Sequence, residues 1–206
     1  AVRYVGNRSS GRMGWALAAA ARDRGAEVVV VQANVDLPRE PGIRYVDAPT
    51  AAAMRDACVA EFPGADILIM CAAVADYRPT DQRAGKLDKS AADALTVEME
   101  RTTDILAELS SMRGDQVLIG FAAEHGPEGL ERARGKRRRK AVDMVVHNDA
   151  AVDGAAFEGD DNIITIIGPG DDETPLQRMS KRRCAEAILD AAMPLVAGDR
   201  PAAVTP

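Results

Sequence analysis

Nine residues near the start of the chain, Gly6 to Gly14, have the composition of an anion-binding turn. Three glycines and two serines lie here, between a short apolar run (2–5) and an alanine-rich segment that favours a helix. The first backbone N–H groups of a helix have no partner within it, and the helix dipole favours negative charge there. The glycine spacing fits neither standard nucleotide fingerprint. A phosphate-binding turn and an ordinary capping turn therefore both remain open.

Four lysines are the next candidates for chemistry. Lys86 and Lys89 lie in a polar stretch (76–93), where a lysine beside a glycine can fold over a triphosphate. Lys136 and Lys140 are four residues apart on a predicted helix, so they share one face and favour an anionic ligand. In both pairs, solvated charge is the alternative.

The lysine pair belongs to a basic run, 132–140, which also allows two other interpretations. Solvated charge explains most of the run, in particular Arg137 to Arg139. A nucleic-acid patch is the second candidate, but no aromatic residue is interleaved for base stacking. The net charge of −6 also argues against a general nucleic-acid binder.

Two carboxylates follow predicted strands. Asp76 comes after the small residues Ala72 and Ala73, which leave room for a flat ring or chain against the backbone. Its carboxylate suits amino or hydroxyl donors, although a tight turn with a solvated Asp76 is the alternative. Glu124 is a candidate partner for magnesium or a hydroxyl group, or a cap for the next helix.

Strand and helix patterns alternate along the chain and predict an α/β fold. Continuous apolar strands, with 66–74 at the centre, indicate a mostly parallel, Rossmann-like sheet with helices on both faces, a three-layer sandwich. Ligands in such folds bind at the carboxyl ends of the strands. Expected strands are 26–31, 43–46, 66–74, 116–123, 144–146 and 162–167, with an edge strand at 95–99, and expected helices are 11–24, 51–60 after a Thr50 cap, a segment to 111 capped by Thr102 or Thr103, 127–140 and 180–193.

Composition bounds the class. With 206 residues, 47% hydrophobic and 28% charged, the chain predicts one globular domain, which we place at 1–193, followed by a flexible tail at 194–206. No apolar run approaches the ~20 residues that span a bilayer. Three scattered cysteines favour reduced thiols and a cytoplasmic location, and two distant histidines make a zinc site improbable.

In this order, the motifs resemble the phosphopantothenate–cysteine ligase family in its bacterial form, over roughly residues 1–192. The family domain is usually the C-terminal half of a bifunctional protein that also carries a decarboxylase. The long motifs are Arg-Tyr-Val-Gly-Asn-Arg-Ser-Ser-Gly-Arg-Met-Gly (3–14) and Ala-Ala-Val-Ala-Asp-Tyr-Arg-Pro (72–79). Shorter matches are Gly-Lys-Leu-Asp-Lys (85–89), Thr-Asp-Ile-Leu (103–106), Gly-Phe-Ala-Ala-Glu (120–124), the lysine pair and Asn148-Asp149.

The resemblance implies ligation of 4′-phosphopantothenate to cysteine through an acyl-cytidylate, with CTP as co-substrate, Mg²⁺ on the triphosphate and a homodimer. It implies catalytic roles for Asn7, at the intermediate, and for Lys86, on a mobile loop. Implied substrate contacts are Arg3, Asn7, Ala72, Ala73 and Asp76. Implied nucleotide contacts are Ser9, Ser10, Gly11, Ala72, Asp76, Lys86, Thr103, Asp104, Ile105, Leu106, Phe121, Lys136 and Lys140.

Departures from the family pattern keep other functions open. Asp88 replaces a usual lysine, and Thr102-Thr103 replaces a usual Asn-Pro, so an ATP-using or paralogous acid–amine ligase remains possible. A Rossmann-type NAD(P) reductase is a rival, although the second strand ends in Gln32 rather than an acidic residue. A non-catalytic nucleotide-binding module is the third alternative.

Overall fold

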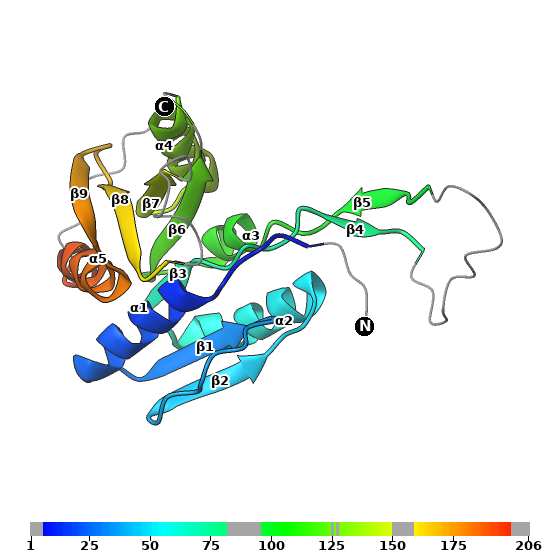
Figure 1. The fold of residues 1–206 in the computed structure, drawn as a ribbon, viewed down its shortest axis with the longest axis horizontal. Coiled ribbons are helices and arrows are strands. Elements are labelled where there is room, and N and C mark those ends of the chain that lie inside the picture. Colours follow the sequence, from blue (N-terminus) through cyan, green and yellow to red (C-terminus); the bar gives the residue numbers. More distant parts are fainter. Residues whose placement is uncertain (1–5, 82–95, 125, 127, 150–158, 199–206) are drawn as a thin grey trace.

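The computed structural model describes residues 6–81, 96–124, 126, 128–149 and 159–198. These residues form an α/β arrangement of helices and strands, drawn in Figure 1. The helices are α1 (Arg12–Asp23), α2 (Ala51–Glu61) with a 3₁₀ turn (Phe62–Gly64), α3 (Ile105–Met112), α4 (Gly129–Lys140) and α5 (Lys181–Val196). The strands are β1 (Val28–Gln32), β2 (Ile43–Asp47), β3 (Ile67–Met70), β4 (Tyr77–Pro79), β5 (Met99–Arg101), β6 (Val117–Glu124), β7 (Met144–Asp149), β8 (Asp161–Ile167) and β9 (Glu173–Ser180).

The main sheet is mixed, with the strand order β3-β6-β7-β8-β9. Strands β3, β6 and β7 are parallel, whereas β8 and β9 are antiparallel to their neighbours. The α/β class is confirmed, but the sheet is less parallel than predicted, because a tight turn closed by Gly168 N–H to Asp172 C=O joins β8 to β9. Such a turn can join only antiparallel strands.

Two strand predictions need correction, and one strand of the sheet was not predicted. The 66–74 segment forms β3 at an edge of this five-stranded sheet, not at its centre. The 26–31 segment forms β1, which pairs only with β2 among the described strands and is half-buried rather than covered on both faces. Strand β9 was not predicted, since Pro175 and mostly exposed side chains hide the pattern of an edge strand.

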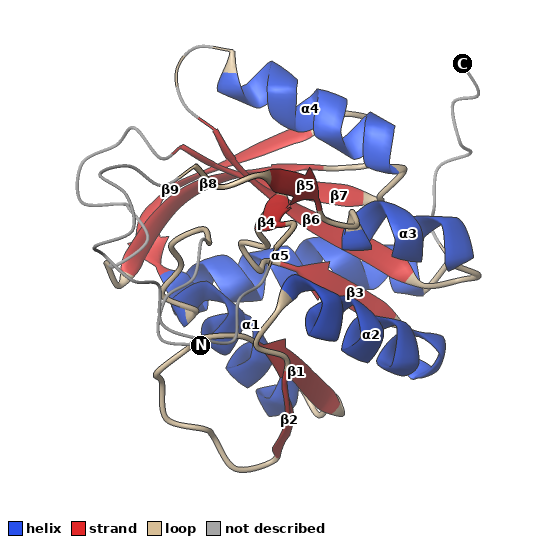
Figure 2. Cartoon of the chain, turned by 90° about the vertical axis from the view of Figure 1, so that its right-hand side faces the viewer, coloured by secondary structure: helices blue, strands red, loops and turns tan. Residues whose placement is uncertain are grey.

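Two hydrophobic clusters cover the two faces of the sheet. Val117 and Ile119 pack in one cluster with residues of α1 and α5. Leu118, between them in β6, packs in the other cluster with residues of α2, α3 and α4. Successive strand residues point to opposite faces, so the continuous apolar strands are buried on both. Figure 2 shows the sheet between these two sets of helices.

Strands β4 and β5 form an antiparallel pair that extends away from the main sheet (Figure 1). The sequence predicted a loop over 76–93 and an edge strand at 95–99, so the strand at Tyr77–Pro79 is new and β5 lies later than expected. The side chains of Tyr77 and Val97 are 46% and 47% exposed in this hairpin. The lysine predictions at Lys86 and Lys89 lie outside the described residues.

Local signals fix most helix ends. The Thr50 hydroxyl accepts a hydrogen bond from Ala53 N–H, which confirms it as the cap of α2. The cap of α3 is Asp104 rather than Thr102 or Thr103, and its carboxylate accepts from Ala107 N–H. Helix α5 continues past the predicted end at 193 to Val196, because Leu195 packs in the core. Residues 199–206 of the expected tail lie outside the described residues.

Gly11 is the residue before α1, with φ +72° and Val35 against it. A Cβ at this position would lie 2.7 Å from a Val35 methyl group. Gly25, at the other end of α1, has φ +86° but no atom within 4 Å of an added Cβ. Both glycines therefore have a positive φ, which disfavours other residues, but only Gly11 has a side chain packed where a Cβ would lie.

We expect Gly11→Ala to lower the free energy of unfolding by about 3 kcal/mol, roughly 1 from the positive φ and roughly 2 from the clash with Val35. Gly25→Ala carries only the first cost, about 1 kcal/mol. Urea denaturation of both variants measures the difference. Equal losses would mean that Val35 moves aside without cost.

Candidate functional site

The loop before α1 is attached to the carboxyl end of β3. Asn7 Nδ2 donates a hydrogen bond to Val74 C=O at 2.9 Å. Ala72 and Ala73, which the sequence predicts to be substrate contacts, are exposed shortly after the end of β3. The structure therefore joins the glycine-rich loop to the Ala72–Asp76 segment at the carboxyl end of β3, the kind of edge where α/β folds bind ligands.

The start of α1 keeps the character of an anion site. Ser9 and Ser10 lie directly before it, and their hydroxyls accept long hydrogen bonds from Gly11 N–H (3.4 Å) and Arg12 N–H (3.5 Å). Gly11 caps the helix without a side-chain hydrogen bond, and the first turn of α1 contains no acidic residue. The positive end of the helix dipole is thus not neutralised by an acidic side chain of α1.

The start of α3 also reaches this edge, but only through its backbone and its cap. The side chains of Ile105 and Leu106 are buried in the core, and a Cβ on Gly120 would lie 2.9 Å from Leu106. These two predicted nucleotide contacts can therefore act only through main-chain groups. Thr103 and Asp104 are exposed, and the Asp104 carboxylate pairs with Lys140.

The two lysines of α4 contact β6 and the start of α3. Lys136 Nζ donates to Phe121 C=O at 2.6 Å. Burial lowers the pKa of Lys136, although the charges of Glu124 and Asp76 oppose this change. Burial likewise lowers the pKa of Lys140, opposed by Asp76. Asp76 therefore lies within electrostatic range of both ammonium groups, and an anion placed there would stabilise their charged forms.

The base of the hairpin holds Asp76 in place. Thr102 Oγ1 donates to Ala75 C=O at 2.6 Å, and Thr102 N–H donates to Asp76 C=O at 2.9 Å. The sequence suggests Thr102 as a helix cap and not as a partner of the 75–76 backbone. No local pattern reveals this role, because the partners are about 26 residues apart in the chain.

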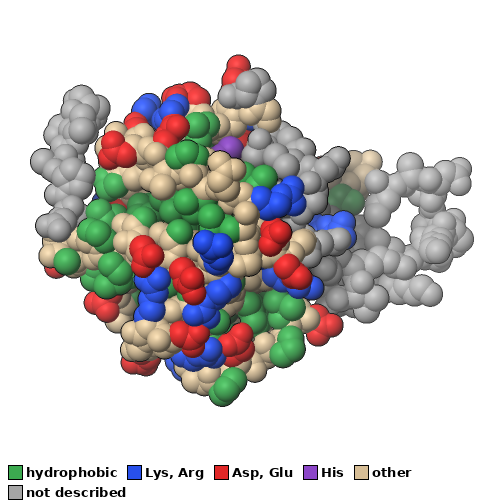
Figure 3. All heavy atoms as spheres, turned by 60° about the vertical axis from the view of Figure 1, so that its left-hand side comes forward, with side chains coloured by type: hydrophobic (Ala, Val, Ile, Leu, Met, Phe, Trp, Pro, Cys, Tyr) green, Lys and Arg blue, Asp and Glu red, His purple; other side chains and the backbone are tan. Residues whose placement is uncertain are grey.

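Most of the remaining basic run is neutralised by acidic partners. Arg137 and Arg138 both bind the Asp171 carboxylate, at 2.7 Å for Arg137, so they are not simply solvated as predicted. Arg132 donates a hydrogen bond to the Glu124 carboxylate at 2.9 Å. The N-cap residue of α4 is Glu128, so Glu124 does not cap this helix. Figure 3 shows Lys and Arg interspersed with Asp and Glu on the side that carries α1 and α5. On α4 itself, the acidic partners of Arg132, Arg137 and Arg138 neutralise most of the run, which gives no support to a nucleic-acid patch there.

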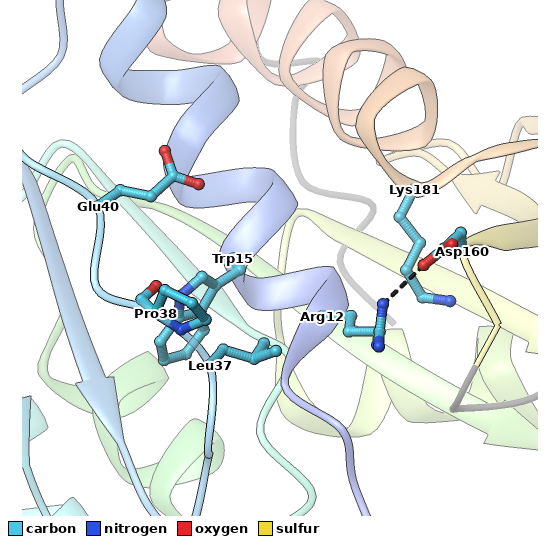
Figure 4. Close-up of a pocket in the computed structure, with 7 residues that line it drawn as sticks. All are labelled: Arg12, Trp15, Leu37, Pro38, Glu40, Asp160 and Lys181. Carbon is cyan, nitrogen blue, oxygen red and sulfur yellow. Dashed lines mark hydrogen bonds and ion pairs between the residues drawn. The ribbon is translucent and has the colours of Figure 1, made fainter.

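A separate pocket of about 320 Å³ lies along the first turns of α1. Figure 4 shows Arg12 pointing to Asp160, with a 2.7 Å contact, beside Lys181 at the start of α5. Trp15 donates to Pro38 C=O at 2.8 Å on the other side. None of the predicted site residues lines this pocket; its ion pair ties α1 to the start of β8.

Two of the predicted site residues have no described position. Arg3 and Lys86 lie outside the described residues. Among the residues that the structure does describe, no group of three or more His, Cys, Asp or Glu side chains could hold a metal ion. Cys58, Cys71 and Cys184 are free thiols, as predicted. Within the same residues, no helix is long and apolar enough to cross a membrane.

Sequence comparison finds relatives over nearly the whole chain. The Coenzyme A biosynthesis bifunctional protein CoaBC of Bacillus subtilis (strain 168) is 38% identical over 203 residues, which are 97% of this chain and 49% of that protein. The protein of the same name from Vibrio vulnificus (strain YJ016) is 41% identical over 180 residues, 85% of this chain and 44% of that protein. The chain thus spans about half the length of these curated relatives.

Solved structures and a family model agree with these relatives. A crystal structure of the C-terminal domain of CoaBC matches with a TM-score of 0.79 and 35% identity, covering 96% of this chain and 90% of that chain. A DNA/pantothenate metabolism flavoprotein from Streptococcus pneumoniae shares the fold, with a TM-score of 0.80 at 17% identity over 94% of this chain and 92% of that chain. The family model described as DNA/pantothenate metabolism flavoprotein C-terminal domain matches residues 1–195. The chain therefore belongs to this family, the phosphopantothenate–cysteine ligase domain of bifunctional coenzyme A biosynthesis proteins, as its motifs predict.

Proposed function

We propose that this domain ligates 4′-phosphopantothenate to cysteine in a CTP-dependent reaction. The observation that carries the proposal is the pair of partly buried lysines on α4. Lys136 binds Phe121 C=O in β6, and Lys140 pairs with Asp104 at the start of α3. The charge of Asp76 acts on the pKa values of both lysines. The glycine-rich loop is attached to the carboxyl end of β3 through Asn7. In a family of coenzyme A biosynthesis domains, this combination suits the activation of an acid by a nucleotide.

The proposed reaction has two steps. The carboxylate of 4′-phosphopantothenate attacks the α-phosphorus of CTP, pyrophosphate leaves, and an acyl-cytidylate forms. The amine of cysteine then attacks the acyl carbon, and CMP leaves. Asn7 donates to the oxyanion that develops at that carbon, and Lys86 neutralises phosphate charge. Ala72, Ala73 and Asp76 lie near the cytosine and the pantothenate moiety.

Charge balance supports this arrangement. CTP and phosphopantothenate are both anions, so their approach requires cations, and Lys136 and Lys140 are partly buried cations whose charge an anion would stabilise. Mg²⁺ belongs to the proposal as a partner of the triphosphate. With no cluster of three acidic or histidine side chains among the described residues, the phosphates and water would supply most of its ligands.

The lowered pKa of Lys136 predicts proton uptake on nucleotide binding. Burial disfavours the charged lysine in the free domain, and a bound triphosphate favours it, so binding raises this pKa toward or above its ordinary value of 10.5. Affinity for CTP should therefore fall as the pH rises through the pKa of the free domain. Titration calorimetry at alkaline pH in buffers of different ionisation enthalpy measures the protons taken up. Binding without any proton uptake, at every alkaline pH tested, would contradict the prediction.

A homodimer and a fused or associated decarboxylase complete the proposal. The exposed Tyr77 and Val97 of the projecting hairpin support a partner surface there. The family resemblance assigns Arg3 a contact with phosphopantothenate across the dimer interface. This chain matches about half the length of the curated bifunctional relatives, and their remaining half supports a decarboxylase that is fused to or associated with this domain. A three-layer, Rossmann-like domain and a cytoplasmic location belong to the same proposal, with the domain extended from the predicted end at 193 to the end of α5 at Val196.

Pyrophosphate release tests the reaction directly. The domain is incubated with Mg²⁺, 4′-phosphopantothenate and either CTP or ATP, with and without cysteine. CTP-dependent release, with product formed only when cysteine is present, is the expected result. Turnover with ATP alone would keep the reaction and overturn the nucleotide. Binding of CTP without release would indicate a non-catalytic module, and oxidation of NAD(P)H would indicate the reductase.

A further inference from the structure

Asn148 lies at the carboxyl end of β7, on the face of the sheet that carries α1. Met144 and Val146 pack in the cluster with α1 and α5, whereas Val145 packs in the cluster on the other face. Because side chains alternate along a strand, Asn148 shares the face of Met144 and Val146. Its partner in β8, Ile164, belongs to the same cluster and confirms this orientation.

The side-chain oxygen of Asn148 has no hydrogen-bond partner among the described residues. This Oδ1 atom is buried, and the residue as a whole is only 9% exposed. A buried acceptor without a partner is unfavourable in the free protein, and such atoms are uncommon in folded domains.

The surroundings of Asn148 belong to the ligand edge of the sheet. Asn162, two residues before Ile164 on the same face, contacts the Met13 sulfur of α1 at 3.7 Å. Arg12 pairs with Asp160, which fixes the first turn of α1 over the start of β8. On the other side of Asn148, its partner in β6 is Ala123, which is exposed. Asn148 therefore lies between the start of α1 and an open position at the end of β6.

We propose that the side-chain oxygen of Asn148 accepts a hydrogen bond from the amine of the incoming amino acid. This inference rests on the proposed ligation. Phosphates and carboxylates are acceptors and cannot satisfy an acceptor atom. In the proposed ligation the cytosine lies near Ala72 and Asp76, and the lysines of α4 lie on the face of the sheet opposite Asn148. The amine is the donor that must enter from elsewhere, because it attacks after the acyl-cytidylate has formed.

Asn148 orients the amine and exchanges no proton with it. The ammonium group of the amino acid first loses a proton to solvent. The neutral nitrogen attacks the acyl carbon and forms the C–N bond. The bond from that carbon to the phosphate oxygen breaks, CMP leaves with the electron pair, and a second proton goes from nitrogen to solvent. The product is an amide, and the hydrogen bond to Asn148 directs the nitrogen lone pair to the carbonyl.

Two substitutions distinguish acceptor, donor and structural roles. Asn148→Leu keeps the size and removes the acceptor, and we expect the KM for cysteine to rise about 10- to 100-fold. Asn148→Asp keeps an acceptor oxygen and removes the N–H donor, and we expect a KM for cysteine within about 3-fold of the unaltered domain. Neither change should slow the pyrophosphate burst from CTP and phosphopantothenate without cysteine. Asn148→Leu should melt at the same or a higher temperature.

Each other outcome overturns the proposal. A slowed burst in Asn148→Leu, with Asn148→Asp slower still, would show that the amide donates to phosphate. Unchanged kinetics in Asn148→Leu would remove Asn148 from the site, and a lower melting temperature would give it a structural role. If the unaltered domain releases no pyrophosphate with any nucleotide, the proposed function itself fails, which the same assay separates from failure at Asn148.

Discussion

Replacing Lys136 by methionine is expected to lower kcat/KM for CTP by about 100-fold, because it removes a desolvated cation from the proposed nucleotide site. Lys136 is held by Phe121 C=O at 2.6 Å, so its ammonium group is already oriented in the free domain. Methionine retains most of the apolar stem that packs under the site. Steady-state pyrophosphate release at varied CTP concentration measures the loss.

Arg139→Gln is the matched control for this substitution. Arg139 is an exposed cation on the same helix, three residues away, and its charge lowers the pKa of Lys136. Removing it should leave kcat/KM for CTP within about 3-fold, since exposed charges contribute little. Equal losses in the two variants would mean that the basic run attracts the nucleotide as a whole. No loss in Lys136→Met would remove this lysine from the site.

Sequence reasoning predicted elements well where the signal is local. The cap at Thr50 and the end of α1 before Gly25 depend on residues within one helical turn, and both are confirmed. The N-cap of α3 lies at least one residue later than predicted, because threonine and aspartate are both favourable N-cap residues and Thr103 precedes Asp104. Packing decides between them, since Ile105 and Leu106 must reach the core in the first turn.

Features that depend on distant partners were not predictable in this way. The edge position of β3 depends on its pairing with β6, and the antiparallel hairpin joins β4 to β5. Both pairings are between segments far apart in the chain. Strand β9 escaped because its side chains are mostly exposed, so it lacks the apolar run of a buried strand. Apolar periodicity reports burial, and these strands are defined by backbone pairing instead.

The candidate site follows the same division. The spacing of Lys136 and Lys140 was sufficient to place both on one helix face. Nothing in the sequence shows that Asp104 holds Lys140 while it caps α3, or that Phe121 C=O receives Lys136. The types and order of the residues thus predict the chemistry of the site, while its charge pairing requires the fold.

Asn7 is the second residue whose replacement should have a large effect. If its amide donates to the oxyanion at the acyl carbon, Asn7→Ala should lower kcat by about 100- to 1000-fold with little change in the KM for CTP. The free domain should be almost as stable as before, because the hydrogen bond to Val74 C=O that is lost is exposed. Single-turnover measurement of acyl-cytidylate consumption locates the effect on a step, and thermal melting checks the fold.

Asn7→Asp separates donation from shape. Aspartate has nearly the same size but no N–H, and its negative charge opposes an oxyanion, so this variant should be at least as slow as Asn7→Ala. An aspartate variant that retains activity would mean that Asn7 acts through its shape alone. A large rise in the KM for CTP, with the rate of the bound complex unchanged, would place Asn7 in nucleotide binding. The oxyanion role requires the loss to fall on kcat, because only a contact that strengthens in the transition state raises the rate.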